Sequence, residues 1–247
     1  MAPSTGQKLP TFIGVGAELI NISQQLLLAA KTLAPTDSMV EILKKFPISE
    51  IHGQLTTDDM KKAFWINLYN AFTQIILLKD PGQYKIRSQF FGSKQINIAG
   101  LIMSLDDIEH GILRRSKIKW SKGYLDKLFP SSFEKKNRVS KLDYRIHFAL
   151  NCGAKSCPPI AFYKPEQIDK QLEIATKTYL KGEATYDPVE NTVSVPALMR
   201  WFIHDFGGEK NVIKLLRSLE VVPSNVNPKV HFKEYDWNLF LSNYEDI

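Results

Sequence analysis

The sequence has only two cysteines in 247 residues, which are too few to form a disulfide scaffold. We therefore expect a reducing cytoplasm, although a secreted or periplasmic protein with its leader removed would look the same. No run reaches about 18 consecutive apolar residues, so we expect no transmembrane segment. The first residues lack a charged stretch followed by an apolar one, and thus do not resemble a signal peptide.

The sequence also lacks internal repeats, low-complexity tracts and a linker rich in glycine, serine or proline. With 44% hydrophobic and 23% charged residues, its composition is that of an ordinary globular protein able to bury a sizeable core. We expect an N-terminal helical segment over residues 1–56 and a main domain over residues 57–247, packed together as one compact unit.

Positive charge is concentrated in one stretch. The formal net charge is +6, and residues 114–141 hold ten lysines and arginines. Such a surface could meet nucleic acid or anionic lipid, or it could be a solvated excursion. No signature of a nucleic-acid-binding module accompanies it, so we expect a small molecule or a peptide as the partner, of unknown identity.

Helical patterns outnumber strand patterns and do not alternate with them, which predicts an α+β fold, predominantly helical with a small mixed or antiparallel sheet. Capping residues, apolar spacing and Gly/Pro stops predict helices over residues 18–33, 37–45, 58–79, 104–115, 165–180, 197–206 and 209–219. Short apolar or alternating runs predict strands over residues 95–98, 145–150, 192–195 and 230–235.

Both cysteines fall in the stretch His147–Pro159, which reads HFALNCGAKSCPP. A thiol acts as a nucleophile only as the thiolate, so Cys157 or Cys152 would need a base, and His147 is the nearest in sequence. Three hypotheses stay open: a Cys-His catalytic site, a redox or disulfide pair, and structural cysteines in a tight loop. The spacing matches no common zinc pattern, and we predict no metal or cofactor.

The predicted helix 58–79 is apolar around nearly its whole circumference, and Asn67, Asn70 and Gln74 fall in one narrow stripe. Such amides are expected to be buried and to need partners. They either hold loop backbone, for example the loop after Leu150, or serve as orienting or oxyanion-type donors in a catalytic site.

Glu109 lies on the apolar face of the predicted helix 104–115, so we expect it to be substantially buried and in contact with a cation or with several donors. Arg145 and His147 are the leading candidates for this partner. The neighbouring His110 projects to the other side of the helical wheel, and we expect it to be solvated.

Four motifs together resemble domain-of-unknown-function family 547. They are FWINLYNA from Phe64, SLDDIE from Ser104 with a following Ile-Leu-Arg, DYRIHFALNC from Asp143 with a following SCPP, and Tyr-Asp-Trp from Tyr235. The main domain 57–247 is therefore identified as a family 547 domain. A looser similarity to the transglutaminase/papain-like arrangement comes from a buried helix followed by a strand that carries His147. In that arrangement Asn67 stands where those enzymes place their cysteine.

Two functional hypotheses follow. In the first, the protein is a thiol-dependent hydrolase or acyl transferase acting on a peptide or amide-type substrate. Its catalytic residues would be Cys157 or Cys152, His147, Asn67 or Asn70, and Glu109. In the second, it is a non-catalytic module that binds a ligand or a protein, and its Cys/His/Asn polar cluster is structural.

Overall fold

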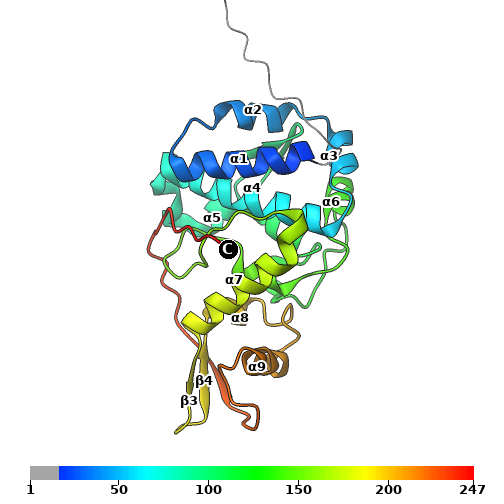
Figure 1. The fold of residues 1–247 in the computed structure, drawn as a ribbon. Coiled ribbons are helices and arrows are strands. Elements are labelled where there is room, and N and C mark those ends of the chain that lie inside the picture. The colour runs from blue at the N-terminus through cyan, green and yellow to red at the C-terminus, as the bar shows by residue number, and fades with distance from the viewer. Residues whose placement is uncertain (1–16) are drawn as a thin grey trace, which may run out of the picture.

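The computed structural model describes residues 17–247. The fold is α+β and predominantly helical, with two small sheets (Figure 1). The α-helices are α1 (Ala17–Thr32), α2 (Asp37–Lys45), α3 (Ile48–Gln54), α4 (Asp58–Lys79), α5 (Arg87–Gly92), α6 (Ser132–Asn137), α7 (Ile168–Glu183), α8 (Ala197–Trp201) and α9 (Glu209–Ser218). The strands are β1 (Ile96–Ile98), β2 (Leu101–Met103), β3 (Thr185–Asp187), β4 (Thr192–Val195) and β5 (Lys229–Phe232). Single turns of 3₁₀ type are η1 (Pro81–Ile86), η3 (Lys119–Ser121), η4 (Tyr144–Phe148) and η5 (Pro165–Gln167), and η2 (Asp107–Leu113) is a π-helix.

Helix α4 is the centre of the larger core. The hydroxyl of Thr57 caps its N-terminus by accepting a hydrogen bond from the backbone N–H of Met60 at 3.2 Å, as the sequence predicts. Side chains on every face of the helix are buried, because α1, the π-helix and α7 surround it. Figure 1 shows α2, α1 and α4 in successive layers. The predicted helix 58–79 is thus confirmed at both ends.

The two sheets are small and peripheral. Strands β1 and β2 form an antiparallel hairpin, whose turn at Ala99 and Gly100 has positive φ at both residues. In the other sheet β4 lies between β3, which is antiparallel to it, and β5, which is parallel. This second sheet stands apart from α1 and α2 (Figure 1). The strands predicted near residues 95–98, 192–195 and 230–235 are all present.

A second apolar cluster joins the mixed sheet to α8, α9 and the end of α7. It includes Phe148, which directly follows His147, and Phe206, which directly follows Asp205. The larger cluster, around α4, contains Ala149, Leu150 and Cys157. Residues 147–157 therefore run along the boundary between the two clusters, which is where the site described below lies.

The segment 145–150 is not the predicted strand. It is a 3₁₀ turn, η4, which begins where the Asp143 side chain accepts a hydrogen bond from the backbone of Arg145 at 3.1 Å. The burial of Phe148 and Leu150 is confirmed. A short, fully buried apolar run has the same composition in a strand and in a helical turn, so periodicity did not distinguish them.

The predicted helix 104–115 begins as expected. The Ser104 hydroxyl accepts from the backbone of Asp107 at 3.1 Å, and Asp107 accepts from the backbone of Ser104 at 2.7 Å. The helix then widens into π geometry, with the Arg114 amide bonded to the Glu109 carbonyl at 2.7 Å. No helix among residues 17–247 combines the length and the apolar character needed to cross a membrane.

Candidate functional site: an aromatic cavity beside a disulfide loop

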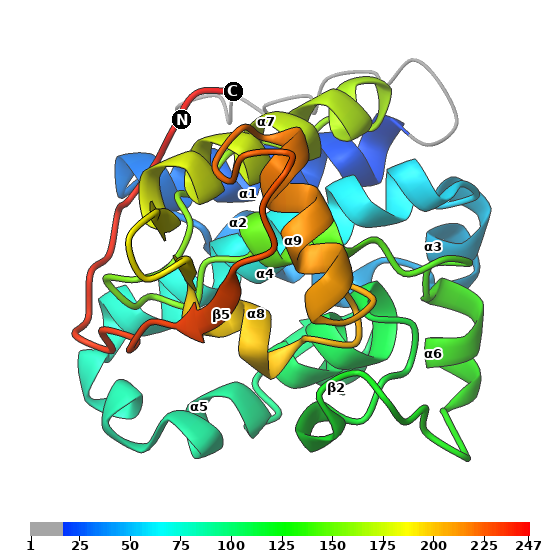
Figure 2. The same ribbon diagram turned by 90° about the horizontal axis from the view of Figure 1, so that it is seen from below.

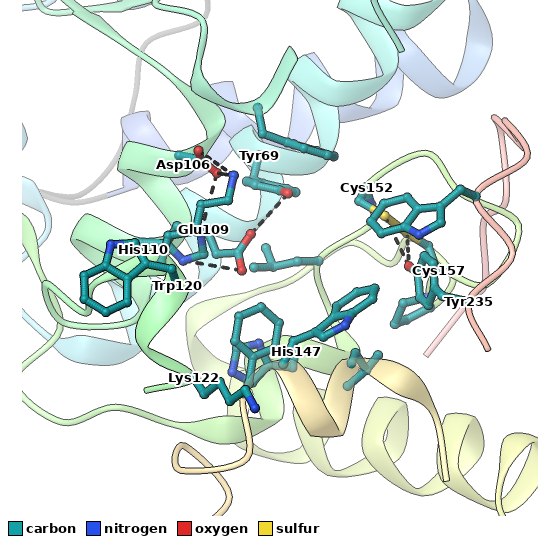
Figure 3. Close-up of a pocket in the computed structure, with 18 residues that line it drawn as sticks. Tyr69, Asp106, Glu109, His110, Trp120, Lys122, His147, Cys152, Cys157 and Tyr235 are labelled. Carbon is teal, nitrogen blue, oxygen red and sulfur yellow. Dashed lines mark hydrogen bonds and ion pairs between the residues drawn. A yellow bond between two sulfur atoms is a disulfide. The ribbon is translucent and has the colours of Figure 1, made fainter. Parts of the chain in front are cut away.

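A cavity of about 530 Å³ lies between α4, the π-helix η2, α8 and the residues after β5, 233–247, which we call the C-terminal segment (Figure 3). Its wall includes two acidic residues, two histidines, two lysines and both cysteines. Seven of its lining residues are aromatic: Tyr69, Phe91, Trp120, Trp201, Phe202, Tyr235 and Trp237. This size and this mixture of aromatic surface with a few polar groups are typical of sites for small organic molecules.

Cys152 and Cys157 form a disulfide. Of the three hypotheses left open by the sequence, the structure therefore contains the one in which the two cysteines are paired. The Tyr235 hydroxyl lies 3.2 Å from the sulfur of Cys152 and 3.1 Å from that of Cys157. The Tyr235 ring packs against Trp201 and Trp237 at centroid distances of 4.8 and 4.5 Å. The disulfide and this aromatic cluster together make one wall of the cavity.

The loop that carries the disulfide is ordered by Gly153 and by contacts with the C-terminal segment. Gly153 has φ +85°, a left-handed conformation that favours glycine, and a Cβ there would also lie 2.8 Å from Cδ1 of Leu77 in α4. The backbone amides of Lys155 and Ser156 donate to carbonyls of Asn238 and Asp236 at 2.8 and 3.2 Å. The loop is therefore fixed from both sides.

The amide stripe of α4 anchors backbone, as one of the two alternatives predicted. Asn70 donates to the Ala149 carbonyl at 2.9 Å and accepts from the Asn151 amide at 2.8 Å. Asn67 makes the same pair of bonds with the backbone of Tyr163, at 2.9 and 3.0 Å. Neither asparagine lines the cavity. The catalytic role predicted for them stays a prediction, and their bonds are those of loop anchors.

The third residue of the stripe has a similar part. Gln74 accepts a hydrogen bond from the backbone amide of Ser242 at 2.9 Å. One face of α4 thus holds three segments that are distant in sequence, and the C-terminal segment is one of them. That contact helps to place the adjoining Tyr235–Trp237 stretch along the cavity wall.

His147 lines the cavity but is committed to a buried ion-pair network. Its Nε2 lies 2.9 Å from Asp205, which also receives Arg114 at 2.6 and 3.2 Å. Burial alone would raise the pKa of Asp205, but the hydrogen bonds from His147 and Arg114 outweigh it and bring this pKa down to about 2. Asp205 is therefore ionised, and the Nε2–H of His147 donates to it.

Burial lowers the pKa of His147 more than the Asp205 carboxylate raises it, so the ring is neutral near pH 7. The ring also stacks on Phe202 at a centroid distance of 3.9 Å. A neutral ring with its Nε2–H donated to Asp205 has an unprotonated Nδ1. Within residues 17–247 that nitrogen has no hydrogen-bond partner.

Arg114 also determines which ring nitrogen of His110 carries the proton. One guanidinium nitrogen lies 2.9 Å from Nδ1 of His110, and because arginine only donates, Nδ1 must accept. The ring proton is then on Nε2, which faces Asp106 at 3.5 Å. The prediction that His110 is solvated was wrong: the ring is buried. A π-helix has more than 3.6 residues per turn, so the helical wheel misplaced it.

Glu109 is largely buried, with 13% of its side chain exposed, but the predicted partners were wrong. Arg145 pairs with Asp143 and Asp169 instead, and His147 bonds Asp205. One carboxylate oxygen of Glu109, Oε2, accepts from the Tyr69 hydroxyl at 3.3 Å. Burial and the nearby Glu109 charge raise the pKa of Tyr69, so this hydroxyl keeps its proton.

The other oxygen of Glu109, Oε1, lies 3.7 Å from Nδ1 of His110, whose lone pair is already taken by Arg114. No donor among residues 17–247 bonds to it. The second acid of the cavity wall, Asp106, is by contrast paired with Lys119 at 2.7 Å. Glu109 therefore turns Oε1 toward the cavity, and the dashed line that joins it to His110 in Figure 3 is this 3.7 Å approach, which is too long for a hydrogen bond.

Sequence reasoning missed Asp205, Tyr69 and the three aromatic residues around the disulfide. Asp205 had a detectable signal, because it stands in the apolar stretch WFIHDF from Trp201, where an acid is costly unless it is paired. Among residues 17–247, no group of three or more histidine, cysteine or acidic side chains is placed to hold a metal ion.

Comparison with known proteins gives a family without an assigned activity. Residues 53–180 match the family described as "Protein of unknown function, DUF547". The chain belongs to this family. No curated protein and no solved structure matched it. The similarity to the transglutaminase/papain-like arrangement therefore stays a prediction.

Only part of the cavity wall comes from the residues that match the DUF547 family. The matched range contains every site residue predicted from the sequence, among them Glu109, His147 and both cysteines. Asp205 and the aromatic side chains of Trp201, Tyr235 and Trp237 come from outside it. The cavity is thus built jointly by the matched segment and by the region that follows it.

Proposed function

We propose that the protein binds a small organic molecule in this cavity, with a planar apolar body against the aromatic wall and a protonated amine toward Glu109. One observation carries the proposal: a carboxylate oxygen that lacks a donor faces a cavity lined by seven aromatic residues. A carboxylate in such surroundings is stabilised when a ligand brings a charged donor.

The neighbouring charges support an amine in preference to an anion. Asp106 is paired with Lys119, and Asp205 is paired with both Arg114 and His147. Glu109 is thus the one acid of the cavity wall, among residues 17–247, without a basic side chain donating to it. The faces of aromatic rings also attract cations, which adds to the preference.

Lys122 supplies a second point of recognition. It lines the cavity, and within residues 17–247 it takes part in no ion pair. A ligand with both an amine and an acceptor group could be held between Glu109 and Lys122. Amino-acid-like and peptide-like molecules have this pair of groups, so they are the ligand class that we favour.

A matched pair of probes tests the preference for an amine. Phenethylamine and 3-phenylpropionate both carry a phenyl ring but have opposite charges. We expect phenethylamine to bind and 3-phenylpropionate to bind much more weakly. Binding can be followed by intrinsic fluorescence, because Trp120, Trp201 and Trp237 line the cavity. Equal binding of both probes would contradict the assignment of Glu109.

The variant Glu109→Gln keeps the shape of the side chain and removes its charge. We expect it to weaken phenethylamine binding by roughly 10- to 100-fold, which corresponds to one hydrogen bond between charged groups. Glu173→Gln on the exposed face of α7 is the matched control and should leave binding unchanged.

Thiol-dependent hydrolysis or acyl transfer on a peptide or amide-type substrate is a second candidate, because Cys152, Cys157 and His147 line the same cavity. It requires an added dithiol reductant, which reduces the disulfide to two thiols; one of these, deprotonated by His147, would attack the substrate carbonyl and expel the amine or alcohol. Activity on an amide or ester substrate should then appear only after reduction and be lost in Cys157→Ser or Cys152→Ser. Iodoacetamide labelling of the reduced protein against pH would show whether either thiol is activated. Two results together would favour the binding function. They are phenethylamine binding by the oxidised protein, and no turnover of the amide or ester substrate either before or after reduction.

A further inference from the structure

The net positive charge of the chain comes from one segment, residues 114–141, and of its basic side chains Arg114 alone is fully buried, in the ion pair with Asp205. This basic segment holds ten basic and two acidic residues, whereas the whole chain has a net charge of only +6. The rest of the chain is therefore slightly acidic. An asymmetry of this kind orients a protein toward an anionic surface.

Several of these charges have no internal partner. Lys117 pairs with Asp126 at 2.8 Å, and Lys127 pairs with Glu134 at 3.2 Å. Lys122, Lys135, Lys136 and Lys141, by contrast, are exposed and form no ion pair in the described part of the chain. These lysines can therefore contact an anionic surface without first giving up an ion pair within the protein.

Large apolar side chains stand exposed among these lysines. Leu128 and Phe129 are 86% and 93% exposed, and they lie in the loop that leads to α6. Trp120 in η3, and Tyr124 and Leu125 after it, are also exposed and precede them in the sequence. Figure 2 shows the chain just before α6 at the edge of the molecule. Five large apolar side chains exposed within ten residues of sequence are more than the scattered single exposures of an ordinary surface, and they indicate an interaction surface.

We propose that the basic segment docks on an anionic lipid bilayer, with Leu128 and Phe129 inserted at the level of the headgroups and the unpaired lysines against the lipid charges. Aromatic and leucine side chains flanked by lysine are the composition of surfaces that bind at this interface. Nucleic acid is disfavoured, because an aliphatic tip such as Leu128 gains little from stacked bases or phosphates.

The segment also touches the cavity. Lys119, Trp120 and Lys122 belong to it and line the cavity wall. A docked membrane would therefore lie next to one side of the proposed ligand site. The docking proposal does not depend on that site, because none of the charged and apolar groups that carry it needs a ligand in the cavity.

Sedimentation with lipid vesicles tests the proposal on the full chain. We expect binding to vesicles in which about one third of the phosphatidylcholine is replaced by phosphatidylserine, and no binding to pure phosphatidylcholine. Each lysine near an anionic surface contributes roughly fivefold in affinity. The triple variant Lys135→Ala/Lys136→Ala/Lys141→Ala, which leaves the cavity wall unchanged, should therefore bind on the order of a hundredfold more weakly. Raising the salt concentration should weaken the wild type in the same direction.

The apolar contribution has its own variant and control. Leu128→Ser/Phe129→Ser should weaken binding to the anionic vesicles by roughly tenfold or more, because two exposed side chains lose their burial in the interface. Leu33→Ser/Val189→Ser also changes two exposed apolar residues outside the segment, and should bind like wild type. Lys170→Ala/Lys177→Ala/Lys210→Ala is the corresponding control for the lysine variant.

Several results would overturn the proposal. Absence of binding to anionic vesicles would do so, as would equal binding to neutral ones, or binding that both segment variants leave unchanged. Analytical ultracentrifugation covers one further outcome. If the wild type is a dimer that Leu128→Ser/Phe129→Ser dissociates, the surface is an interface between two copies, and docking on lipid is refuted.

Discussion

Replacing Asp205 by asparagine, which has the same shape but no charge, should strongly destabilise the folded protein. The Asp205 and Arg114 side chains are both fully buried, and their ion pair at 2.6 Å is shared with His147. Asparagine fills the same volume but leaves the Arg114 charge buried without a counter-ion. Breaking a buried pair in this way costs about 3–5 kcal/mol, which for a chain of this size lowers Tm by roughly 6–20 °C.

Urea denaturation followed by circular dichroism measures this cost, provided that unfolding is two-state. Asp169→Asn is the matched control, because Asp169 also pairs with an arginine, Arg145, at 2.6 Å but is 79% exposed. An exposed pair contributes at most about 1 kcal/mol, so the control should be nearly as stable as wild type. If Asp205→Asn also cost less than about 1 kcal/mol, the buried network would not hold the two apolar clusters together.

The same pair predicts how stability depends on pH. The pKa of Asp205 falls from 3.8 to about 2 on folding, so its stabilisation is complete above pH 3.8 and is lost as the pH falls toward 2. The loss is about 2 kcal/mol. His147 also has a lowered pKa, so its contribution begins to fall when the pH drops below 6.5. The difference in stability between wild type and Asp205→Asn should therefore shrink by about 2 kcal/mol between pH 5 and pH 2.

Two further substitutions test how the disulfide loop is held. Asn70→Ala removes both hydrogen bonds to the loop backbone, so we expect a loss of roughly 2–3 kcal/mol and new proteolytic cleavage within residues 151–160; an unchanged cleavage pattern would contradict the anchor role. Gly153→Ala should cost at least about 1–3 kcal/mol in urea denaturation, because φ is +85° and the new Cβ would lie 2.8 Å from Leu77. Gly182→Ala in α7 has open space around it and should be neutral or slightly stabilising, and similar losses for both glycine variants would rule out the steric explanation.

Features of this protein that are set by nearby residues can be predicted from its sequence. Helix α4 was predicted at both ends because its signals, the Thr57 cap and the stop at Pro81-Gly82, lie within the helix and next to it. The amide stripe was also visible, since helical spacing alone places Asn67 and Asn70 on one face. That they bond backbone was one of two alternatives, and it rests on the general need of buried amides for partners, whereas the partner of Asn67, Tyr163, was not predicted.

The failures concern partners that are distant in sequence. Glu109 was assigned to Arg145 or His147, but Asp143 and Asp205 hold those residues. Asp205 lies 58 residues after His147, and nothing in the spacing connects the two. The π-helix was a second cause, because a helical wheel drawn at 3.6 residues per turn misplaced His110.

Arg114 connects the structural network to the proposed ligand site. One edge of its guanidinium neutralises Asp205, and another donates to Nδ1 of His110. Because that bond occupies the Nδ1 lone pair, His110 has no Nδ1–H to turn toward Glu109 Oε1, which lies 3.7 Å away. Arg114, which is buried between the two clusters, thus places the His110 proton on Nε2 and leaves Oε1 of Glu109 free to accept a hydrogen bond from a ligand. An amine preference that disappeared in Glu109→Gln, while the Asp205 network stayed intact, would be the direct sign of this arrangement.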